Sequence, residues 1–235
     1  MAALSRAVAP ADRRRQAPAL EARSLYRFFR AAEEETLALQ GVSLSVSAGE
    51  LVVVVGPSGS GKSTLLGCLA GLDDPDGGSV QVAGIRISHQ PEPLRARIRA
   101  AHIGVVFQSG NLVEHLTVAE NVRLSRSLGD RRNRGPADGL LGSVGLDSRR
   151  DAYPSELSGG ESARAGLAVA LANDPEILLA DEPTGELDGD TEAALLRLLR
   201  VRTAAGLAVL VASHSPAVSR TADRVIELLD GRVRT

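Results

Sequence analysis

The chain is short of several residue types, and each shortage excludes a class of protein. It contains one cysteine, Cys68, so no disulfide can form within the chain and a small disulfide-stabilised fold is excluded. Aromatic residues make up 2% of the sequence and hydrophobic residues 43%, so the core must be largely aliphatic. No apolar run approaches the ~18 residues of a membrane-spanning helix. The net charge is −2, and no dense basic patch with interleaved aromatics is present, which disfavours binding to nucleic acid.

Lysine is almost absent, and its one occurrence is informative. Lys and Arg together number 27, and every one of them except Lys62 is arginine. Lys62 lies in residues 56–64, GPSGSGKST, which match the phosphate-binding pattern G-x-x-x-x-G-K-[ST]. An ammonium group is compact enough to lie along such a loop and reach phosphate oxygens, whereas a guanidinium group is a wide planar fork. The pattern therefore predicts a site for nucleotide phosphates.

The segments around this loop follow the order that phosphate binding requires. Residues 51–55 are an aliphatic run typical of a buried parallel strand, and residues 65–70 predict the helix that follows the loop. Backbone N–H groups in such a loop and the N-terminus of the helix attract anions. A glycine-rich turn without a ligand is the alternative, and this order of elements argues against it. We expect the phosphates to be bound by Gly56, Pro57, Ser58, Gly59, Ser60, Gly61, Lys62, Ser63 and Thr64.

The pattern of apolar runs and turns predicts an α/β fold. Its parts are a phosphate-loop core with a largely parallel sheet, an antiparallel β subdomain and an inserted α-helical subdomain. Residues 23–50 and 79–87 have the alternation of antiparallel strands, with acidic residues 33–35 at a hairpin tip. Residues from about 109 to 170 are more polar and helical, and they are the expected helical subdomain.

The chain divides into a tail and one folded domain. Residues 1–21 are rich in Ala, Arg and Pro and lack the apolar block of a secretory signal. We expect a flexible tail there, with contact to a membrane surface as the alternative. Residues 22–235 are expected to fold, with a mobile loop at residues 131–136, RRNRGP.

Two carboxylates follow a buried strand. Residues 176–180 predict a buried strand whose last four residues, ILLA, are apolar, and Asp181 and Glu182 follow it directly. Asp181 is predicted to hold Mg²⁺, together with Ser63, because Mg²⁺ prefers hard oxygen ligands. Glu182 is predicted to polarise the attacking water. An isolated Asp-Glu pair is more often a surface loop, and the apolar strand before it favours the catalytic interpretation.

The most specific motif is LSGGE at residues 157–161. By itself, the serine could simply cap the helix that follows. Together with the phosphate loop, Gln108, the Asp-Glu pair, Asp188 and His214, in this order, the chain resembles the ATP-binding cassette (ABC) ATPases over about residues 22–234.

This resemblance implies ATP hydrolysis with Mg²⁺ in a head-to-tail homodimer. Gln108 matches the glutamine that senses the metal and the attacking water. His214 matches the histidine that contacts the γ-phosphate and supports Glu182. Asp188 matches the aspartate that links the two sites across the dimer. The γ-phosphate bound by one copy would meet, from the other copy, Ser158, Gly159, Gly160 and Glu161.

An aromatic residue near the first strand stacks on the base in this family. Phe29 is the best match, Tyr26 and Phe28 are alternatives, and a role in the core is open for each. The preference for adenine over guanine follows from the resemblance alone.

Residues 71–73, the acidic extension near Glu33 and residues 116–122, LTVAENV, resemble the subgroup of macrolide-exporter, lipoprotein-releasing and cell-division ATPases. The subgroup implies a separately encoded transmembrane permease subunit, whose coupling helix would bind at residues 109–122. It also implies a peripheral location on the cytoplasmic face of the membrane.

Several positions differ from the family pattern. Ser162 and Ala163 replace two glutamines, Val169 replaces an arginine, Ser215 replaces an aspartate, and Glu186 is unusual. None of these changes removes a group that handles phosphate, metal or water, so hydrolysis remains the prediction, with a weaker dimer or weaker coupling as the expected effect.

Other functions stay open. One is a non-transport ABC ATPase acting as a regulatory or cell-division module, and another is a nucleotide-binding switch with little hydrolysis. Phosphoryl transfer to a small acceptor is disfavoured, because LSGGE has no purpose in such a kinase.

Overall fold

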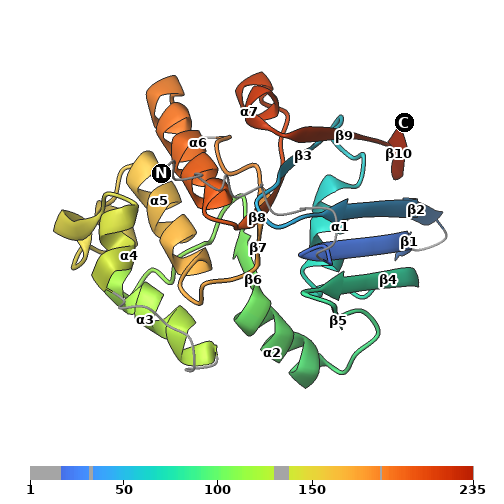
Figure 1. The fold of residues 1–235 in the computed structure, drawn as a ribbon, viewed down its shortest axis with the longest axis horizontal. Coiled ribbons are helices and arrows are strands. Elements are labelled where there is room, and N and C mark those ends of the chain that lie inside the picture. The colour runs from blue at the N-terminus through green and yellow to red at the C-terminus, as the bar shows by residue number, and fades with distance from the viewer. Residues whose placement is uncertain (1–16, 32–33, 130–137, 186, 235) are drawn as a thin grey trace, which may run out of the picture.

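One helix, α1 (Lys62–Leu69), lies between two β-sheets. A group of further helices lies on the far side of the sheet that contains β3 (Leu51–Val55) (Figure 1). The computed structural model describes residues 17–31, 34–129, 138–185 and 187–234. The apolar face of α1 packs against both sheets, because Leu65 and Leu69 belong to a core that also contains Leu20 of one sheet and Val52 of the other. The phosphate loop is thereby held where the two sheets adjoin.

The larger sheet is six-stranded, in the order β10-β9-β3-β8-β7-β6. The pairs of β3 with β8 and β9, and of β7 with β6 and β8, are parallel, while β10 runs antiparallel to β9. Aliphatic strands of this kind need cover on both faces, which explains their continuous apolar sequences. The strands are β3 (Leu51–Val55), β6 (Ile103–Val106), β7 (Ile177–Asp181), β8 (Ala208–Ala212), β9 (Arg224–Leu229) and β10 (Arg232–Arg234).

The smaller sheet is four-stranded and antiparallel, in the order β2-β1-β4-β5. Its strands are β1 (Leu20–Ala31), β2 (Glu34–Val46), β4 (Gly77–Val82) and β5 (Ile85–Arg86). The long hairpin of β1 and β2 has an irregular register, including a shift between Arg27 and Phe28. The backbone of β2 lies close to the phosphate loop, since a Cβ atom on Gly61 would lie 2.5 Å from the carbonyl oxygen of Ala38.

Four of the helices form two groups beside the larger sheet (Figure 1). α5 and α6 cover one face of the larger sheet, where Leu167 and Leu199 pack with Val53 and Leu178. α3 and α4 pack on the other side of α5 around a small core of their own that includes Val122 and Leu141. The helices are α2 (Glu92–His102), α3 (Val118–Leu128), α4 (Asp138–Ser143), α5 (Gly159–Ala170), α6 (Gly189–Ala204) and α7 (Pro216–Thr221), with short 3-10 turns at Asp147–Arg149 and Pro154–Glu156.

The predicted fold class is confirmed: a largely parallel sheet, an antiparallel β subdomain and a helical subdomain are all present. Three elements were not predicted from the sequence, namely α2, α7 and β10. β1 begins at Leu20, inside the expected tail. Outside the described residues lie the rest of that tail (1–16), Glu33, the loop at 131–136 and Glu186.

Cys68 lies on the buried face of α1, and burial raises the pKa of its thiol to about 12. The thiol is therefore protonated at neutral pH and has the inert, structural role that the sequence suggested. Among the residues that the structure describes, no helix combines the length and the apolar character that crossing a bilayer requires.

Candidate nucleotide-binding site

The phosphate loop lies between β3 and α1 and is pressed against two other strands. A Cβ atom on Gly61 would lie 2.5 Å from the carbonyl oxygen of Ala38 in β2, and one on Gly56 would collide with the carbonyl oxygen of Leu228 in β9. Gly61 also has a φ of 101°, a left-handed conformation that favours glycine. Glycine at these two positions is therefore required by close backbone contact as well as by the turn.

Polar groups of this loop fit an anion. The Nζ atom of Lys62 donates to the carbonyl oxygens of Gly56 (2.8 Å) and Pro57 (3.0 Å), so the ammonium group lies across the loop. The hydroxyl of Ser60 is buried and has no hydrogen-bond partner among the described residues. The N-terminus of α1 points to the same place, and its unpaired N–H groups favour negative charge. Ser60 is the one predicted residue of 56–64 that does not line the cavity in front of the loop, so the groups available to an anion are Lys62 and the N–H groups of the loop and of α1.

A cavity of about 730 Å³ opens in front of the loop. This volume lies in the usual range of small-molecule sites. Both sheets contribute to its walls, so it extends from the loop towards the β1-β2 hairpin. Its lining includes predicted residues of the phosphate loop (56–59 and 61–64), Phe29, Gln108, Asp181, Glu182 and His214. It also includes residues that were not predicted from the sequence, namely Thr36, Leu37, Ala38, Gln40, Asp230 and Gly231.

The unpredicted wall is formed by two segments that are distant in the sequence. The side-chain amide of Gln40 donates to the carbonyl oxygen of Asp230 (2.9 Å), and the backbone N–H of Gln40 donates to that of Gly231 (2.8 Å). Arg232 in turn donates to the side chain of Gln40. The turn at residues 230–231 was recognisable in the sequence as a turn, but no local pattern indicated that it borders the site.

Glu182 is held in one orientation by the end of β8. Nδ1 of His214 lies 2.9 Å from one carboxylate oxygen, and the buried hydroxyl of Ser213 donates to the other (3.1 Å). The backbone of Glu182 has a φ of 45°, which is unusual for a residue other than glycine and costs about 1–3 kcal/mol. Such strain is often found at functional sites. Ser213, which was not predicted as a site residue, thus contacts the predicted catalytic carboxylate.

The predicted metal ligands Ser63, Asp181 and Gln108 all line the same cavity. The described part of the chain holds no cluster of three or more His, Cys, Asp or Glu side chains that could bind a metal alone. Mg²⁺ commonly binds through one or two carboxylates together with substrate phosphates and water. The donor set therefore fits Mg²⁺ that arrives with a nucleotide.

Of the three candidate aromatic residues, Phe29 lines the cavity and Tyr26 and Phe28 do not. The guanidinium carbon of Arg27 lies 4.9 Å from the centroid of the Phe29 ring, a cation–π contact. The side chain of Tyr26 packs beside Gly41 and Gly77 instead.

The LSGGE motif begins α5, as expected. Ser158 is the N-cap and forms a capping box with Glu161, whose carboxylate accepts from the N–H of Ser158 (2.9 Å). The same carboxylate accepts from Nε of Arg149 (2.8 Å). The hydrogen bond from Arg149, followed by that from Ser158, lowers the pKa of Glu161 to about 2.

Asp188 caps α6 in a similar way. Its carboxylate accepts from the N–H groups of Asp190 and Thr191 and from the hydroxyl of Thr191 (2.9 Å). The hydrogen bond from the Thr191 N–H lowers the pKa of Asp188. A Cβ on Gly160 would collide with the methyl group of Thr191, so the two caps adjoin. Neither Asp188 nor residues 158–161 line the 730 Å³ cavity, so one copy of the chain does not bring them to its own phosphate loop.

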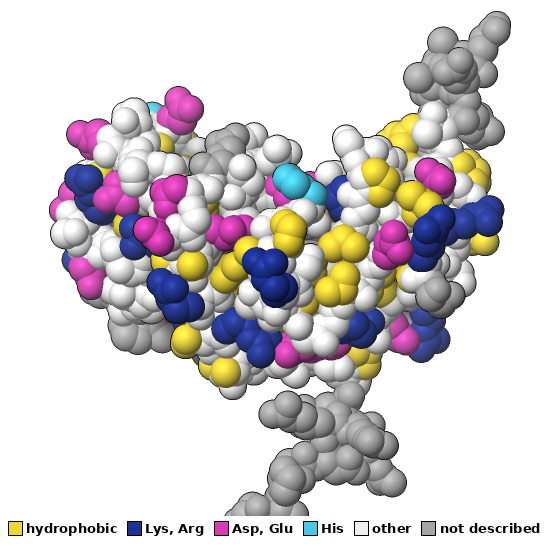
Figure 2. Space-filling view, turned by 90° about the horizontal axis from the view of Figure 1, so that it is seen from above, with side chains coloured by type: hydrophobic (Ala, Val, Ile, Leu, Met, Phe, Trp, Pro, Cys, Tyr) yellow, Lys and Arg dark blue, Asp and Glu magenta, His cyan; other side chains and the backbone are white. Residues whose placement is uncertain are grey.

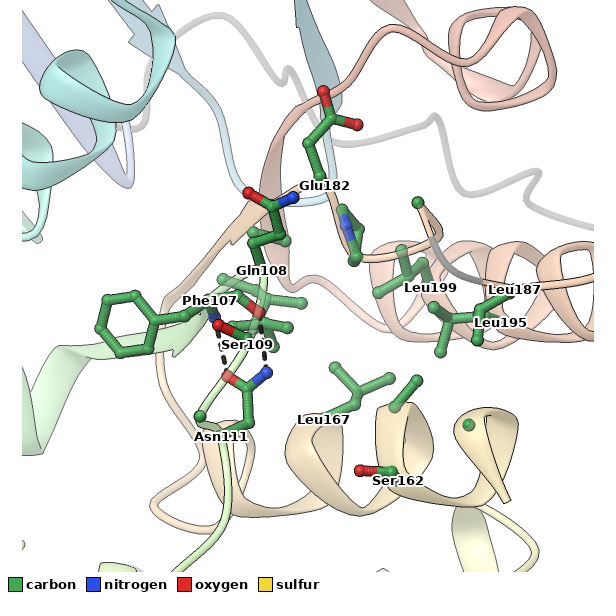
Figure 3. Close-up of a pocket in the computed structure, with 18 residues that line it drawn as sticks. Phe107, Gln108, Ser109, Asn111, Ser162, Leu167, Glu182, Leu187, Leu195 and Leu199 are labelled. Atoms are coloured by element: carbon green, nitrogen blue, oxygen red, sulfur yellow. Dashed lines mark hydrogen bonds between the residues drawn. The ribbon is translucent and has the colours of Figure 1, made fainter. Parts of the chain in front are cut away.

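A second, smaller cavity of about 260 Å³ lies between α5, α6 and the backbone at Gln108 and Glu182 (Figure 3). Leu167 of α5 faces Leu195 and Leu199 of α6 across it, and the side chains of Gln108 and Glu182 extend away from it. Ser162 and Ala163, the residues that replace two glutamines of the family pattern, also line this cavity.

The face of the molecule seen from above is hollowed between two lobes (Figure 2). Arginine and acidic side chains are interspersed on this face.

Comparisons with known proteins agree with this geometry. The ABC transporter family model matches residues 39–185, which include the phosphate loop, Gln108, the LSGGE motif and the Asp-Glu pair. Phe29, Asp188 and His214 lie outside the matched range.

Among curated proteins, the chain is 42% identical over 221 residues to the macrolide export ATP-binding/permease protein MacB of Burkholderia pseudomallei, covering 92% of this chain and 34% of that protein. The chain thus spans about a third of the length of this relative. It is 39% identical to an uncharacterised ABC transporter ATP-binding protein, MJ1508, of Methanocaldococcus jannaschii, covering 91% of this chain and 97% of that protein.

Among solved structures, the fold is similar to that of the ATP-binding cassette MJ0796 in a dimeric post-hydrolysis state bound to ADP and Pi. The TM-score is 0.85 and the identity is 35%, with coverage of 92% of this chain and 97% of the cassette. A second dimeric structure of that cassette matches with the same TM-score.

Proposed function

The chain belongs to the ABC transporter family, in its macrolide-exporter-like group of ATPases, and from this membership we propose that it hydrolyses ATP as a head-to-tail homodimer that drives a membrane permease subunit. One observation carries the proposal. A single cavity collects the phosphate loop, Gln108, the adjacent Asp181 and Glu182, and His214, which come from four separate segments of the chain.

We propose one task for each group that lines the cavity. Lys62 and the N-terminus of α1 would bind the phosphates, and Ser63, Asp181 and Gln108 would hold Mg²⁺. When bound there, Mg²⁺ neutralises charge on the phosphate oxygens. Glu182 orients and polarises the attacking water, since Ser213 and His214 fix its carboxylate. Phe29 stacks on the adenine base at the far end of the cavity.

The second half of the catalytic site comes from another copy. Ser158, Gly159, Gly160 and Glu161 lie at the N-terminus of α5, outside their own cavity. In a head-to-tail dimer this helix N-terminus meets the γ-phosphate bound by the partner. Asp188 adjoins the same region through Thr191, which suits a link between the two sites. The similar cassette MJ0796 has been solved as a dimer.

The membrane partner is a further part of the proposal. MacB is named as an ATP-binding/permease protein. We assign to this chain an ATPase domain that begins with β1 at Leu20 and not at residue 22 as the sequence suggested, with about 109–170 as its helical subdomain, and we propose the permease contact at residues 109–122. The protein would then lie peripherally on the cytoplasmic face of the membrane, bound to a separately encoded permease.

The test compares ATP hydrolysis and ATP-dependent dimerisation in wild type, Glu182→Gln and the matched control Glu227→Gln, whose carboxylate is on the exposed side of β9. Loss of a positioned general base lowers the rate by roughly 10²- to 10⁴-fold, so Glu182→Gln is expected to stop turnover and to accumulate as an ATP-bound dimer in light scattering. The control is expected to behave like wild type.

Other outcomes separate the alternatives. ATP binding by wild type without turnover, even with the permease added, would favour a nucleotide-binding switch and contradict the proposal. Hydrolysis together with co-purification of only soluble division factors would favour the regulatory or cell-division module.

A further inference from the structure

The loop that carries Gln108 is held by one side chain, Asn111. The amide of Asn111 accepts from the N–H of Phe107 (2.7 Å) and donates to the carbonyl oxygen of Phe107 (2.7 Å) (Figure 3). A side chain that binds both backbone groups of one residue acts as a strand partner would, and it closes the turn over residues 107–111. Burial does not hold this turn, because the Phe107 side chain is 46% exposed. The backbone next to Gln108 therefore depends on these two hydrogen bonds.

Asn111 itself rests on α5. A Cβ atom on Gly166 would lie 2.8 Å from Cβ of Asn111 and 3.3 Å from its Cγ. Gly166 is buried in the middle of α5, where glycine is intrinsically unfavourable. Its presence is explained by the space that the Asn111 side chain needs. The loop and α5 are therefore in direct contact at Gly166.

A second glycine extends this contact along α5. A Cβ on Gly104 in β6 would lie 2.5 Å from the carbonyl oxygen of Ala170, one helical turn after Gly166. Positions four residues apart share one face of a helix. One face of α5 is thus fitted closely to β6 and to the loop after it.

The neighbouring face of α5 is not filled in this way. Ser162, Ala163 and Leu167 border one side of the 260 Å³ cavity, and Leu195 and Leu199 of α6 border the other. The loop with Gln108 is therefore fitted to α5 by the contact at Gly166, whereas it faces α6 across this cavity. Since α5 begins directly after Ser158, the loop and the LSGGE motif belong to one packed unit.

We propose that Asn111 is a positioning residue for Gln108. Because the Asn111 side chain also contacts Gly166, it couples the position of Gln108 to the position of α5 and of the LSGGE motif at the start of α5. This inference rests on the proposed role of Gln108 in hydrolysis. Asn111 does not line the nucleotide cavity, so it acts through Gln108 and not on ATP directly.

The test is a double-mutant cycle on ATP hydrolysis with Asn111→Ala, Gln108→Ala and both changes together. Displacing a catalytic group by about 1 Å can cost on the order of 100-fold in rate, so Asn111→Ala is expected to lower kcat by roughly 10- to 100-fold. The KM for ATP is expected to stay within about threefold, because substrate binding is not touched. In the Gln108→Ala background, Asn111→Ala is expected to cause no further loss.

Two variants keep the test decisive if Asn111→Ala does not fold. Asn111→Asp retains the acceptor for the Phe107 N–H and loses the donor to the Phe107 carbonyl oxygen. Gly166→Ala places a methyl group in the space that the Asn111 side chain occupies. Both are expected to lower kcat in the same non-additive way. Asn173→Asp is the matched control, since Asn173 also donates to a backbone carbonyl, that of Ser125 (3.0 Å), away from Gln108. Its kcat is expected to match that of wild type.

The outcomes distinguish the two levels of the argument. If Gln108→Ala leaves kcat unchanged, the proposed role of Gln108 fails and this inference fails with it. If Gln108→Ala lowers kcat but Asn111→Ala does not, only the inference about Asn111 is overturned. The same follows if the loss of kcat in the double variant equals the product of the two single losses, because the two residues then act independently. The same holds if Asn173→Asp lowers kcat as much as Asn111→Asp does.

Discussion

At the scale of single residues, the carboxylate of Glu161 has a role that its place in LSGGE does not reveal. It closes the capping box of α5 and pairs with Arg149. A glutamine at this position could keep the capping box but would lose the ion pair. The negative charge of the motif is thus balanced within the same chain before any partner arrives.

This arrangement predicts a dependence of stability on pH. The folded-state pKa of Glu161 is about 2, below its ordinary 4.5. A carboxyl group whose pKa is lower in the folded state contributes its full stabilisation at pH values above its unfolded-state pKa. For Glu161 this contribution is lost as the pH falls from about 4.5 towards about 2. We therefore expect wild type to exceed Glu161→Gln in stability at pH 7, and the difference to shrink as the pH falls through that window. Urea unfolding at pH 7, 4 and 3 measures it, and a difference that does not vary with pH would contradict the assignment.

At the scale of elements, close contacts between glycines and neighbouring backbones decide how α5 packs on the larger sheet. Gly104 allows β6 to approach Ala170, and a methyl group there would lie 2.5 Å from a carbonyl oxygen. No sequence motif marks Gly104, because its importance comes from a helix that follows more than fifty residues later.

We expect Gly104→Ala to be destabilising because β6 and α5 must separate to admit the methyl group. Overpacking of this kind costs about 1–3 kcal/mol. The control is Gly139→Ala, near the start of α4, where an added Cβ meets no atom within 4 Å, so its stability is expected to match or exceed that of wild type. Chemical denaturation of the two variants measures the difference; equal stability of Gly104→Ala and wild type would refute the close packing.

At the scale of the whole molecule, the nucleotide site spans both sheets. Lys62 lies in the loop and helix that follow β3, an interior strand of the larger sheet, whereas Phe29 lies on β1 of the smaller sheet, and both line the same cavity. The phosphate end and the base end of a nucleotide would therefore be bound by different parts of the fold. This division can be tested with ligands that carry only one end.

We expect ATP and inorganic triphosphate both to raise the melting temperature of wild type, since a ligand at 100 times its Kd stabilises by about 2.7 kcal/mol. Lys62→Ala should weaken the effect of both ligands. Phe29→Ala should weaken only that of ATP, because base stacking contributes about 1–3 kcal/mol. Phe28→Ala is the matched control, as Phe28 does not line the cavity. An equal loss for triphosphate in Phe29→Ala would rule out base stacking.

Local chemistry is what the sequence by itself determined. The phosphate loop, the Asp-Glu pair and the LSGGE helix start each depend on residues a few positions apart, so their patterns are readable in one segment. The parallel strands β3, β6, β7 and β8 were predictable for the same reason, since burial on both faces requires continuous apolar runs, and the antiparallel strands β1, β2 and β4 were indicated by alternation. α2, α7 and β10 escaped prediction: α7 and β10 are short, and α2 is polar apart from a few apolar positions such as the buried Ile98.

Only the tertiary structure decided which distant segments meet. It placed Gln40 against Asp230, 190 residues away in the sequence, Ser213 against Glu182, and Asn111 against Gly166. These contacts arise from the order of strands in the sheets and from the packing of α5, and no residue involved carries a local signal for its partner. The physical reason is that a strand or helix encodes its own conformation locally, whereas the neighbour it packs against depends on the topology of the whole chain.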